Sequence, residues 1–289
     1  MESLKINAYA KINLTLNVGE ISPNTYHYVE SIIQRISLHD ILHIYPLPEK
    51  EFILECTDKS IENESNILYK AYHAMNNIVG LPCGIKVRLK KNIPMQAGLG
   101  GGSADCAAFI IGVNELLNLK LPVSTMEEIG ALLGSDVVAC MYSLSFVTGT
   151  GELVRPLYAK MNYPILIIKQ NFPCSTKKMY ERLDGILHTI EQPNNNKAII
   201  NLLYKIDSIN GLCGKFYNVF EEVVDHKNEL IALRRALLSK NAIATHLCGS
   251  GSCIYSIFAN DYDLEKAYNF IKSRYNYELY KAESMNILH

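Results

Sequence analysis

Apolar and polar positions alternate along much of the first 90 residues, and a period of two predicts strands. Residues 5–18 alternate well enough to form one strand, and residues 30–45, rich in isoleucine and leucine, form a second long strand or hairpin arm. A further stretch places Ile85, Val87 and Leu89 between two lysines and an arginine. Such alternation is typical of a strand with one buried face. The chain therefore opens with a sheet.

Helical spacing interrupts these strands. A helix is expected from Ser65, with Ser65 or Asn66 as its N-cap and Gly80 at its end. Directly after Gly102, residues 103–119 read as a strong helix, and Ser124 opens a capping-box pattern for another helix through residue 133. The order is therefore strand, glycine loop, helix.

The pattern starts afresh near residue 160. An apolar strand is expected at residues 164–169 and an exposed polar loop at residues 192–197. A helix at 227–239, strands at 242–247 and 252–258, a helix at 263–274 and a strand at 278–283 complete the chain. Two helices on one antiparallel sheet account for this order. We therefore predict an α+β protein of two lobes, residues 1–160 and 161–289.

Composition and charge exclude several classes of protein. With 48% hydrophobic and 20% charged residues, a chain of 289 residues can bury a large core. Its 28 basic and 29 acidic residues leave no broad field for binding nucleic acid or an anionic membrane. No apolar run approaches the roughly 20 residues that cross a bilayer, and the N-terminal residues lack a secretory signal layout. We expect a cytoplasmic protein with a small-molecule partner. The sequence does not indicate an oligomeric state.

The eight cysteines predict neither disulfides nor a metal site. The chain lacks a secretion signal and a CxxC pair, so we interpret the thiols as reduced and mostly buried. No set of cysteines and histidines has metal-ligand spacing. A catalytic cysteine is the sharper alternative, but none has a neighbouring histidine that would activate it.

The segment PMQAGLGGGSAD, residues 94–105, carries the clearest chemical signal. Four glycines in five positions let the backbone approach a ligand, and the free N–H groups and dipole of the helix that follows favour an anion. Neither the Walker pattern nor the dinucleotide-binding pattern fits, since no lysine follows the glycines and no GxGxxG spacing with a distant acid is present. A flexible turn is the plain alternative. By itself, the segment predicts a phosphate-binding loop of another kind.

The same motif, PMQAGLGGGSADCAA, resembles the phosphate-binding signature of the GHMP kinases, a family named after galacto-, homoserine, mevalonate and phosphomevalonate kinases. Its doubled-glycine form is most similar to the members that act on a cytidine diphosphate-linked methylerythritol in the non-mevalonate isoprenoid pathway. Three more segments agree in order: AKINLTLNV, YHYVESIIQRISLHD and LCGSGSC. The resemblance implies a ribosomal protein S5-like nucleotide-binding lobe followed by a ferredoxin-like lobe.

The resemblance also implies a site for ATP and for catalysis. Lys11 matches a lysine that lies beside a catalytic aspartate, here Asp136 in LLGSDVVAC. The carboxylate would accept the proton of the substrate hydroxyl, and the ammonium would keep it ionised. Without the resemblance, Asp136 reads as a helix cap and Lys11 as a solvated strand residue. The expected ATP-binding residues are Asn66, Lys91, Pro94, Gly98, Leu99, Gly100, Gly101, Gly102, Ser103 and Ala104, with Ser103 also a candidate ligand for the Mg²⁺ that accompanies ATP.

The resemblance further implies an acceptor site that binds a cytosine base. Tyr26 and Tyr180 match two rings that sandwich cytosine, and His27 would hydrogen-bond the edge of the base. Asn13 would lie near the reacting hydroxyl. The turn formed by Gly249, Ser250 and Gly251 would close over the substrate and its phosphates, although a tight hairpin also explains these residues.

The predicted function is ATP-dependent phosphorylation of the 2-hydroxyl of the cytidine diphosphate-linked methylerythritol. Another small-molecule kinase of the family and a catalytically silent relative are the alternatives. The chain departs from the family in three places: NTYHYV stands for DGYHEL, GSDVVAC for GADVPFF, and Cys248 for a hydroxyl residue. These changes affect ligand geometry more than fold.

Overall fold

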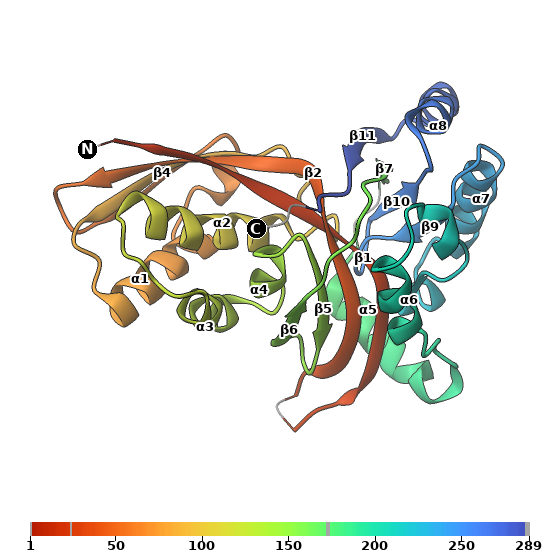
Figure 1. Ribbon diagram of the computed structural model, residues 1–289, viewed down its shortest axis with the longest axis horizontal. Helices are drawn as coiled ribbons and strands as arrows, with labels where there is room; N and C mark the ends of the chain where they lie inside the picture. The colour runs from red at the N-terminus through yellow and green to blue at the C-terminus, as the bar shows by residue number, and fades with distance from the viewer. Residues whose placement is uncertain (1, 24, 172–173, 287–289) are drawn as a thin grey trace. The chain divides into compact units, whose positions relative to one another are not determined.

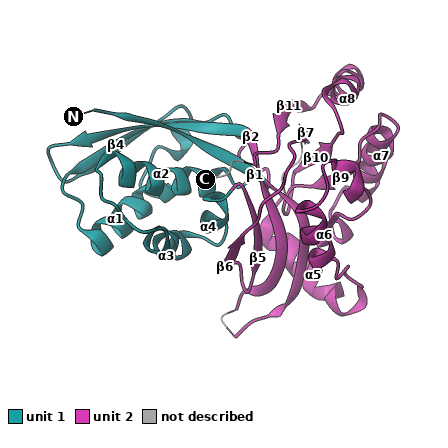
Figure 2. Ribbon diagram, in the orientation of Figure 1, with its two compact units in different colours: residues 1–11, 38–94, 100–142 teal, residues 12–37, 95–99, 143–289 magenta. Residues whose placement is uncertain are grey.

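The computed structural model describes residues 2–23, 25–171 and 174–286. Their strands form a seven-stranded sheet and a four-stranded sheet, with helices packed on each (Figure 1). The chain divides into two compact units, each built from several segments (Figure 2). Unit 1 contains residues 1–11, 38–94 and 100–142, and unit 2 contains residues 12–37, 95–99 and 143–289.

Unit 1 is a sheet with helices on one face (Figure 1). Strand β4 (Gly84–Lys90) pairs antiparallel with the second part of β2 (His27–Leu47) and parallel with β3 (Phe52–Cys56), and the start of β1 (Leu4–Ile21) belongs to the same sheet. Helix α2 packs on these strands, since an added Cβ at Gly112 would meet Ile44 at 2.6 Å. The helices are α1 (Ile67–Val79), α2 (Gly101–Leu116), α3 (Val123–Leu133) and α4 (Val137–Cys140), with a 3-10 turn η1 (Lys59–Ile61).

Unit 2 contains the remaining strands and the second sheet. Strand β5 (Leu144–Thr148) pairs with β2 and with β6 (Leu153–Pro156), and β8 (Tyr217–Asn218) pairs in parallel with β1. The second sheet has the order β11 (Glu278–Glu283), β7 (Pro164–Lys169), β10 (Cys253–Ile257), β9 (Ala244–Leu247), and its neighbours are antiparallel. The other elements are α5 (Thr176–Ile186), η2 (Leu187–Thr189), α6 (Asn196–Leu203), η3 (Ile209–Leu212), η4 (Val219–Glu222), α7 (Lys227–Leu238) and α8 (Asp261–Arg274).

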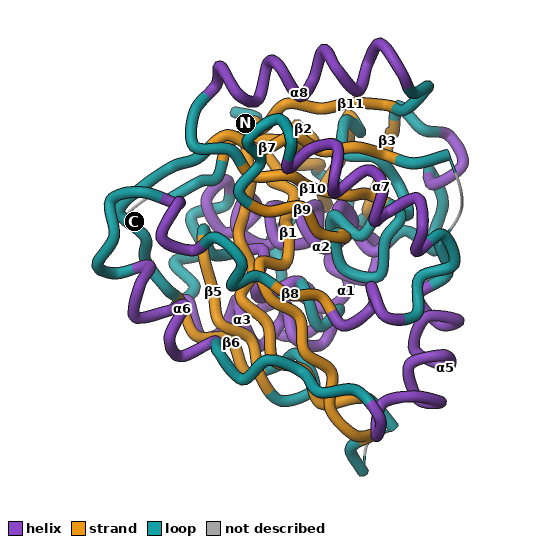
Figure 3. Tube along the Cα trace, turned by 90° about the vertical axis from the view of Figure 1, so that its right-hand side faces the viewer, coloured by secondary structure: helices purple, strands orange, loops and turns teal. Residues whose placement is uncertain are grey.

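Alternation along β7 explains how the second sheet is covered. Leu166 and Ile168 share a core with Leu237 of α7 and Ile271 of α8, so both helices lie on the same face of the sheet (Figures 1 and 3). All four side chains are fully buried. Burying a leucine or isoleucine side chain contributes about 1.5–3 kcal/mol, so packing of the two helices on this face stabilises the unit.

The α+β prediction is confirmed, and so are most predicted elements. The loop expected at residues 192–197 is confirmed for residues 192–195, but it is not fully exposed. The Gln192 amide bonds both backbone groups of Val18 at 2.9 and 2.6 Å, and Asn196 is buried at the start of α6. Helix α3 begins at Val123 with Pro122 as its N-cap, so Ser124 forms no capping box. The division at residue 160 stays a prediction.

None of the described helices is both long and apolar enough to span a membrane.

Candidate active site

Lys11 and Asp136 form an ion pair in unit 1. The Lys11 Nζ lies 3.1 Å from Asp136 Oδ2, and the lysine side chain is 6% exposed whereas the carboxylate is 39% exposed. Asp136 immediately precedes α4, yet its side chain makes no capping hydrogen bond to that helix. The carboxylate is therefore not used as a cap. It is partly open to solvent while a buried ammonium holds it, as a proton acceptor for an incoming hydroxyl requires.

The start of α2 lies against the same lysine. Gly100 is the N-cap with φ +68°, and an added Cβ there would come within 2.9 Å of Lys11 Cγ. Glycine is therefore needed at position 100 both for the backbone angle and for the lysine stem. Gly102 is exposed, and nothing lies within 4 Å of an added Cβ. Gly101, Gly102, Ser103 and Ala104 form the first turn of the helix. The Ala104 N–H donates to the Gly100 carbonyl at 2.8 Å, and the N–H groups before it lie where the start of a helix attracts anions.

Lys91 has buried partners beneath this first turn. Its Nζ pairs with Asp40 and lies 2.7 Å from Asp105 Oδ2, and it lies 3.4 Å from the position of an added Cβ at Gly101. Burial raises the pKa of Asp105 to about 8, and the charge of Asp40 adds to the rise, while Lys91 opposes it. Burial opposes the charge of Lys91, but the two carboxylates outweigh it and raise the pKa of the lysine. This cluster fixes the first turn of α2 to the end of β4.

Asn66 and Pro94 occupy structural positions in unit 1. The Asn66 Oδ1 accepts from the Leu68 N–H at 3.0 Å and caps α1, and its Nδ2 donates to the Ile61 carbonyl at 3.0 Å. Pro94 is buried just after Ile93. Contact of Asn66 or Lys91 with adenine stays a prediction.

The first half of the glycine segment, residues 95–99, belongs to unit 2 and packs on the turn between β9 and β10. Gly98 has φ +75°, and an added Cβ would lie 1.8 Å from the Cys248 carbonyl oxygen. The Ala97 carbonyl accepts from the Cys253 N–H at 3.2 Å, and Leu99 is buried. Gly98 is therefore needed for packing against the turn that contains Gly249, Ser250 and Gly251.

Asn13 and Tyr255 are linked in the interior of unit 2. The Asn13 Nδ2 donates to Ser31 Oγ at 2.8 Å, and the Tyr255 hydroxyl donates to the Asn13 carbonyl at 2.9 Å. Asn13 is 3% exposed, so its orientation is set by the fold rather than by solvent.

The residues expected to bind a base form an aromatic group in unit 2. The His27 ring stacks on Tyr180 with centroids 4.9 Å apart and planes 24° apart. Its Nδ1 faces the Gly19 carbonyl at 3.0 Å, which can only accept, and its Nε2 lies 3.1 Å from Asp184 Oδ1. The Tyr26 side chain is 68% exposed. Asn24, which begins the NTYHYV motif, lies outside the described residues.

Several residues that shape the site did not stand out in the sequence. Asp40 and Asp105 lie in segments that carry the family resemblance, but nothing in the sequence indicates that they contact Lys91. Asn218 and Asp184 carried no local signal, because their partners are 29 to 31 and 157 positions away. Only a contact across the fold identifies such residues.

A magnesium ion bound with ATP fits the residues present. No group of three or more histidine, cysteine, aspartate or glutamate side chains forms a metal site among residues 2–23, 25–171 and 174–286. Mg²⁺ bound through phosphates needs only one or two hard oxygen ligands from the protein. The Ser103 hydroxyl at the start of α2 is a donor of that kind.

Comparison with known proteins places these features in a family. Residues 66–143 match the GHMP kinases N terminal domain, and residues 197–276 match the GHMP kinases C terminal domain. The chain is 37% identical over 277 residues to the 4-diphosphocytidyl-2-C-methyl-D-erythritol kinase of Thermodesulfovibrio yellowstonii, covering 93% of this chain and 94% of that one. It is 34% identical to the enzyme of the same name from Clostridioides difficile, covering 91% and 89%.

Solved structures agree on the fold. A 4-(cytidine 5'-diphospho)-2C-methyl-D-erythritol kinase superposes with a TM-score of 0.81 at 21% identity, over 97% of this chain and 99% of that one. A homoserine kinase from Cytophaga hutchinsonii superposes with a TM-score of 0.73 at 18% identity, over 99% and 95%. The predicted two-lobed fold is confirmed. The chain belongs to the GHMP kinases and, within them, to the family of 4-diphosphocytidyl-2-C-methyl-D-erythritol kinases.

Proposed function

We propose that this enzyme transfers the γ-phosphoryl group of ATP to the 2-hydroxyl of 4-diphosphocytidyl-2-C-methyl-D-erythritol, giving the 2-phosphate and ADP. The observation that carries the proposal is the pair of Lys11 and Asp136 against Gly100 at the start of α2. It is supported by the names of relatives that match nearly the whole chain. As in other kinases of this family, ATP is the phosphoryl donor.

In the proposed reaction, the acceptor hydroxyl oxygen forms a bond to the γ-phosphorus while the bond from that phosphorus to the β–γ bridging oxygen breaks. The hydroxyl proton passes to the Asp136 carboxylate, and the bridging oxygen leaves with ADP. The Lys11 ammonium, 3.1 Å away, keeps the carboxylate ionised beforehand and offsets negative charge on the transferring group. Because the protein does little covalent chemistry, positioning supplies most of the acceleration.

The first turn of α2 would hold the phosphates. Its backbone N–H groups bind phosphate oxygens, and Ser103 offers a hydroxyl to the magnesium ion. When bound, Mg²⁺ neutralises charge on the β- and γ-phosphates. Gly101 and Gly102 would act through their backbone, so a side chain at either position would obstruct the ligand.

The residues expected to bind the acceptor keep the roles predicted for them. Tyr26 and Tyr180 stack on the cytosine, His27 bonds its edge, and Asn13 lies near the reacting hydroxyl. The turn of Gly249, Ser250 and Gly251 binds phosphate oxygens. The stack of His27 on Tyr180 at 4.9 Å leaves no room for a base between those two rings, so the base would occupy another face of the group. The cytoplasmic location stays a prediction from the sequence.

Release of ADP in a coupled assay tests the substrate. The purified enzyme is supplied with ATP, Mg²⁺ and either the cytidine diphosphate-linked methylerythritol, mevalonate, homoserine or galactose. We expect turnover with the first acceptor only. Turnover with one of the other three alone contradicts the substrate assignment, and no turnover with any of them indicates a silent relative.

Asp136→Asn tests the proton acceptor. Loss of a general base typically slows turnover by about 10²–10⁴-fold, and ATP binding should persist because the start of α2 is unchanged. Glu115→Gln makes the same carboxylate-to-amide change at an exposed position of α2 and is the control. Near-normal kcat in Asp136→Asn would remove the role assigned to this residue.

A further inference from the structure

Four successive carbonyl oxygens, from Leu247 at the end of β9 to Ser250 in the turn that leads to β10, accept hydrogen bonds from the protein. Leu247 and Gly249 each accept from Asn218 Nδ2 at 2.8 Å. The Cys248 carbonyl accepts from the Gly251 N–H at 2.8 Å, and the Ser250 carbonyl accepts from the Cys174 thiol at 2.7 Å. Four successive carbonyl groups are thus bound by donors from the protein.

The amide groups of the same turn behave differently. The N–H groups of Leu247 and Cys248 donate to Glu221 Oε1 and to the Cys253 carbonyl, each at 2.8 Å. Among the residues that the structure describes, no acceptor takes the N–H groups of Gly249 and Ser250, although both residues are buried. Buried backbone donors are nearly always paired, so two adjacent unpaired ones indicate a ligand. With Gly249 at φ +51°, successive N–H groups form a concave site for an anion.

Asn218 is the residue that holds these carbonyls. It is fully buried, and it ends β8, which pairs with β1 at Leu16. Its Oδ1 accepts from the Phe220 N–H at 3.0 Å, so the amide orientation is fixed and both hydrogens of Nδ2 are directed to the turn. A carboxylate would keep the Phe220 bond but would present an acceptor to two carbonyl oxygens.

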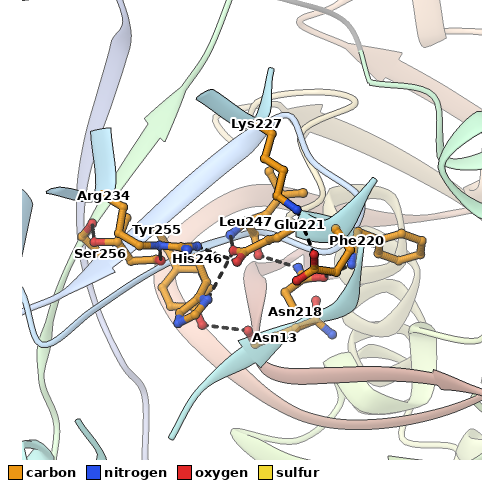
Figure 4. Close-up of polar contacts among 12 residues, drawn as sticks. Asn13, Asn218, Phe220, Glu221, Lys227, Arg234, His246, Leu247, Tyr255 and Ser256 are labelled. Atoms are coloured by element: carbon orange, nitrogen blue, oxygen red, sulfur yellow. Dashed lines mark hydrogen bonds and ion pairs between the residues drawn. The ribbon is translucent and has the colours of Figure 1, made fainter. Parts of the chain in front are cut away.

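Glu221 holds the strand that leads into the turn (Figure 4). Its Oε1 also lies 3.2 Å from His246 Nδ1, and its Oε2 pairs with Arg234 at 2.5 Å. Burial opposes the charge of Glu221, but His246 and Arg234 outweigh it and lower the pKa of the carboxyl. The Arg234 Nε in turn donates to the Thr245 carbonyl at 2.8 Å. The backbone before the turn is therefore held through both its N–H and C=O groups.

We propose that Asn218 is a positioning residue for the reaction, with Cys174 in a supporting part. By holding the carbonyl groups of Leu247, Gly249 and Ser250, the two side chains leave the N–H groups of Gly249 and Ser250 directed at a phosphate oxygen of the bound ligands. This inference rests on the proposed function for the identity of those ligands. It assigns no chemical step to Asn218, which acts through the turn.

Four variants test the proposal by kcat/KM in the ADP-release assay, well below every unfolding temperature. Asn218→Asp should lose at least tenfold in kcat/KM. Cys174→Ala should lose several-fold, whereas Cys174→Ser keeps a donor and should recover most of that loss. Leu237→Ala removes a buried side chain of α7, outside the turn. It should lower the unfolding temperature, but its kcat/KM should stay within about twofold of the original enzyme.

Two outcomes overturn the proposal. The first is a wild-type kcat/KM in Asn218→Asp. The second is a loss of kcat/KM that is in the same proportion to the fall in unfolding temperature in Asn218→Asp as in Leu237→Ala. If Asn218→Asp does not fold, equal activities of Cys174→Ala and Cys174→Ser contradict it. Calorimetric titration with inorganic pyrophosphate measures phosphate binding without the acceptor. We expect Cys174→Ala to bind pyrophosphate more weakly than Cys174→Ser does. An unmodified enzyme that binds pyrophosphate but phosphorylates none of the acceptors contradicts the proposed function alone.

Discussion

Replacing Asp105 with asparagine should change how the stability of the enzyme depends on pH. Asp105 is 3% exposed, and burial together with Asp40 raises its pKa to about 8. In the unfolded chain the same carboxyl titrates near its ordinary value of 3.8. Between these two values the folded protein holds a proton that the unfolded protein has released. The pKa of Lys91 is raised, so its ammonium stays charged across this interval.

The sign follows from proton binding. Since the folded state binds more protons between about pH 4 and pH 8, the free energy of unfolding falls as the pH rises through this interval. One proton corresponds to at most about 1.4 kcal/mol per pH unit. Over about three pH units, the free energy of unfolding of the wild type should therefore fall by up to a few kcal/mol relative to that of Asp105→Asn, whose amide does not titrate. Carboxylates common to both proteins cancel in the difference.

Urea unfolding followed by circular dichroism, at about pH 5, 6.5 and 8, measures this difference. We expect the free energy of unfolding of the variant, relative to that of the wild type, to increase steadily with rising pH. The oxygen of the introduced amide can still accept a hydrogen bond from Lys91, so the variant should fold. A stability difference that is constant with pH, or that grows in favour of the wild type, would refute the assignment of the raised pKa.

Three further substitutions separate packing from ligand binding. Gly98→Ala places a Cβ 1.8 Å from the Cys248 carbonyl at positive φ, so it should lower stability by about 3 kcal/mol or more, measured by thermal unfolding; an unchanged Tm contradicts the contact. Gly102→Ala meets nothing within 4 Å and should raise stability by up to about 1 kcal/mol, yet weaken ATP binding in calorimetry; unaltered affinity would place the phosphates elsewhere. Asn66→Ala removes the cap at the Leu68 N–H and should cost about 1 kcal/mol with kcat unchanged; a much larger loss of ATP affinity than of stability would support a direct contact with adenine.

Much of the fold could be predicted because local signals agreed with it. The strand predicted at residues 278–283 matches β11, and α1 begins after its N-cap Asn66 and ends at Gly80 as expected. The segment at residues 192–197 shows where such reasoning fails. Its polar composition indicates an exposed loop, but the Gln192 side chain extends the hydrogen bonding of β1 from far along the chain. Composition carries no information on that partner.

The residues of the site could likewise be named from the sequence only in part. The glycine segment, Lys11 and Asp136 could be named from motifs, and the structure places the last two 3.1 Å apart. Lys91 could be named but its environment could not, since its partners Asp40 and Asp105 lie 51 and 14 positions away. The pKa of Asp105 depends on that burial and is invisible in the sequence.

By itself, the sequence determined the α+β class, most helices and strands, and a phosphate-binding loop, because periodicity, caps and glycines act over a few residues. Only the tertiary structure decided why Gly98 is glycine, that Asn218 holds the carbonyl groups of a turn 29 to 31 positions away, and that His27 stacks on Tyr180. These are contacts between distant segments, and their geometry exists only once strands and helices have packed. The side chains that position a site are therefore the ones that local patterns leave unmarked.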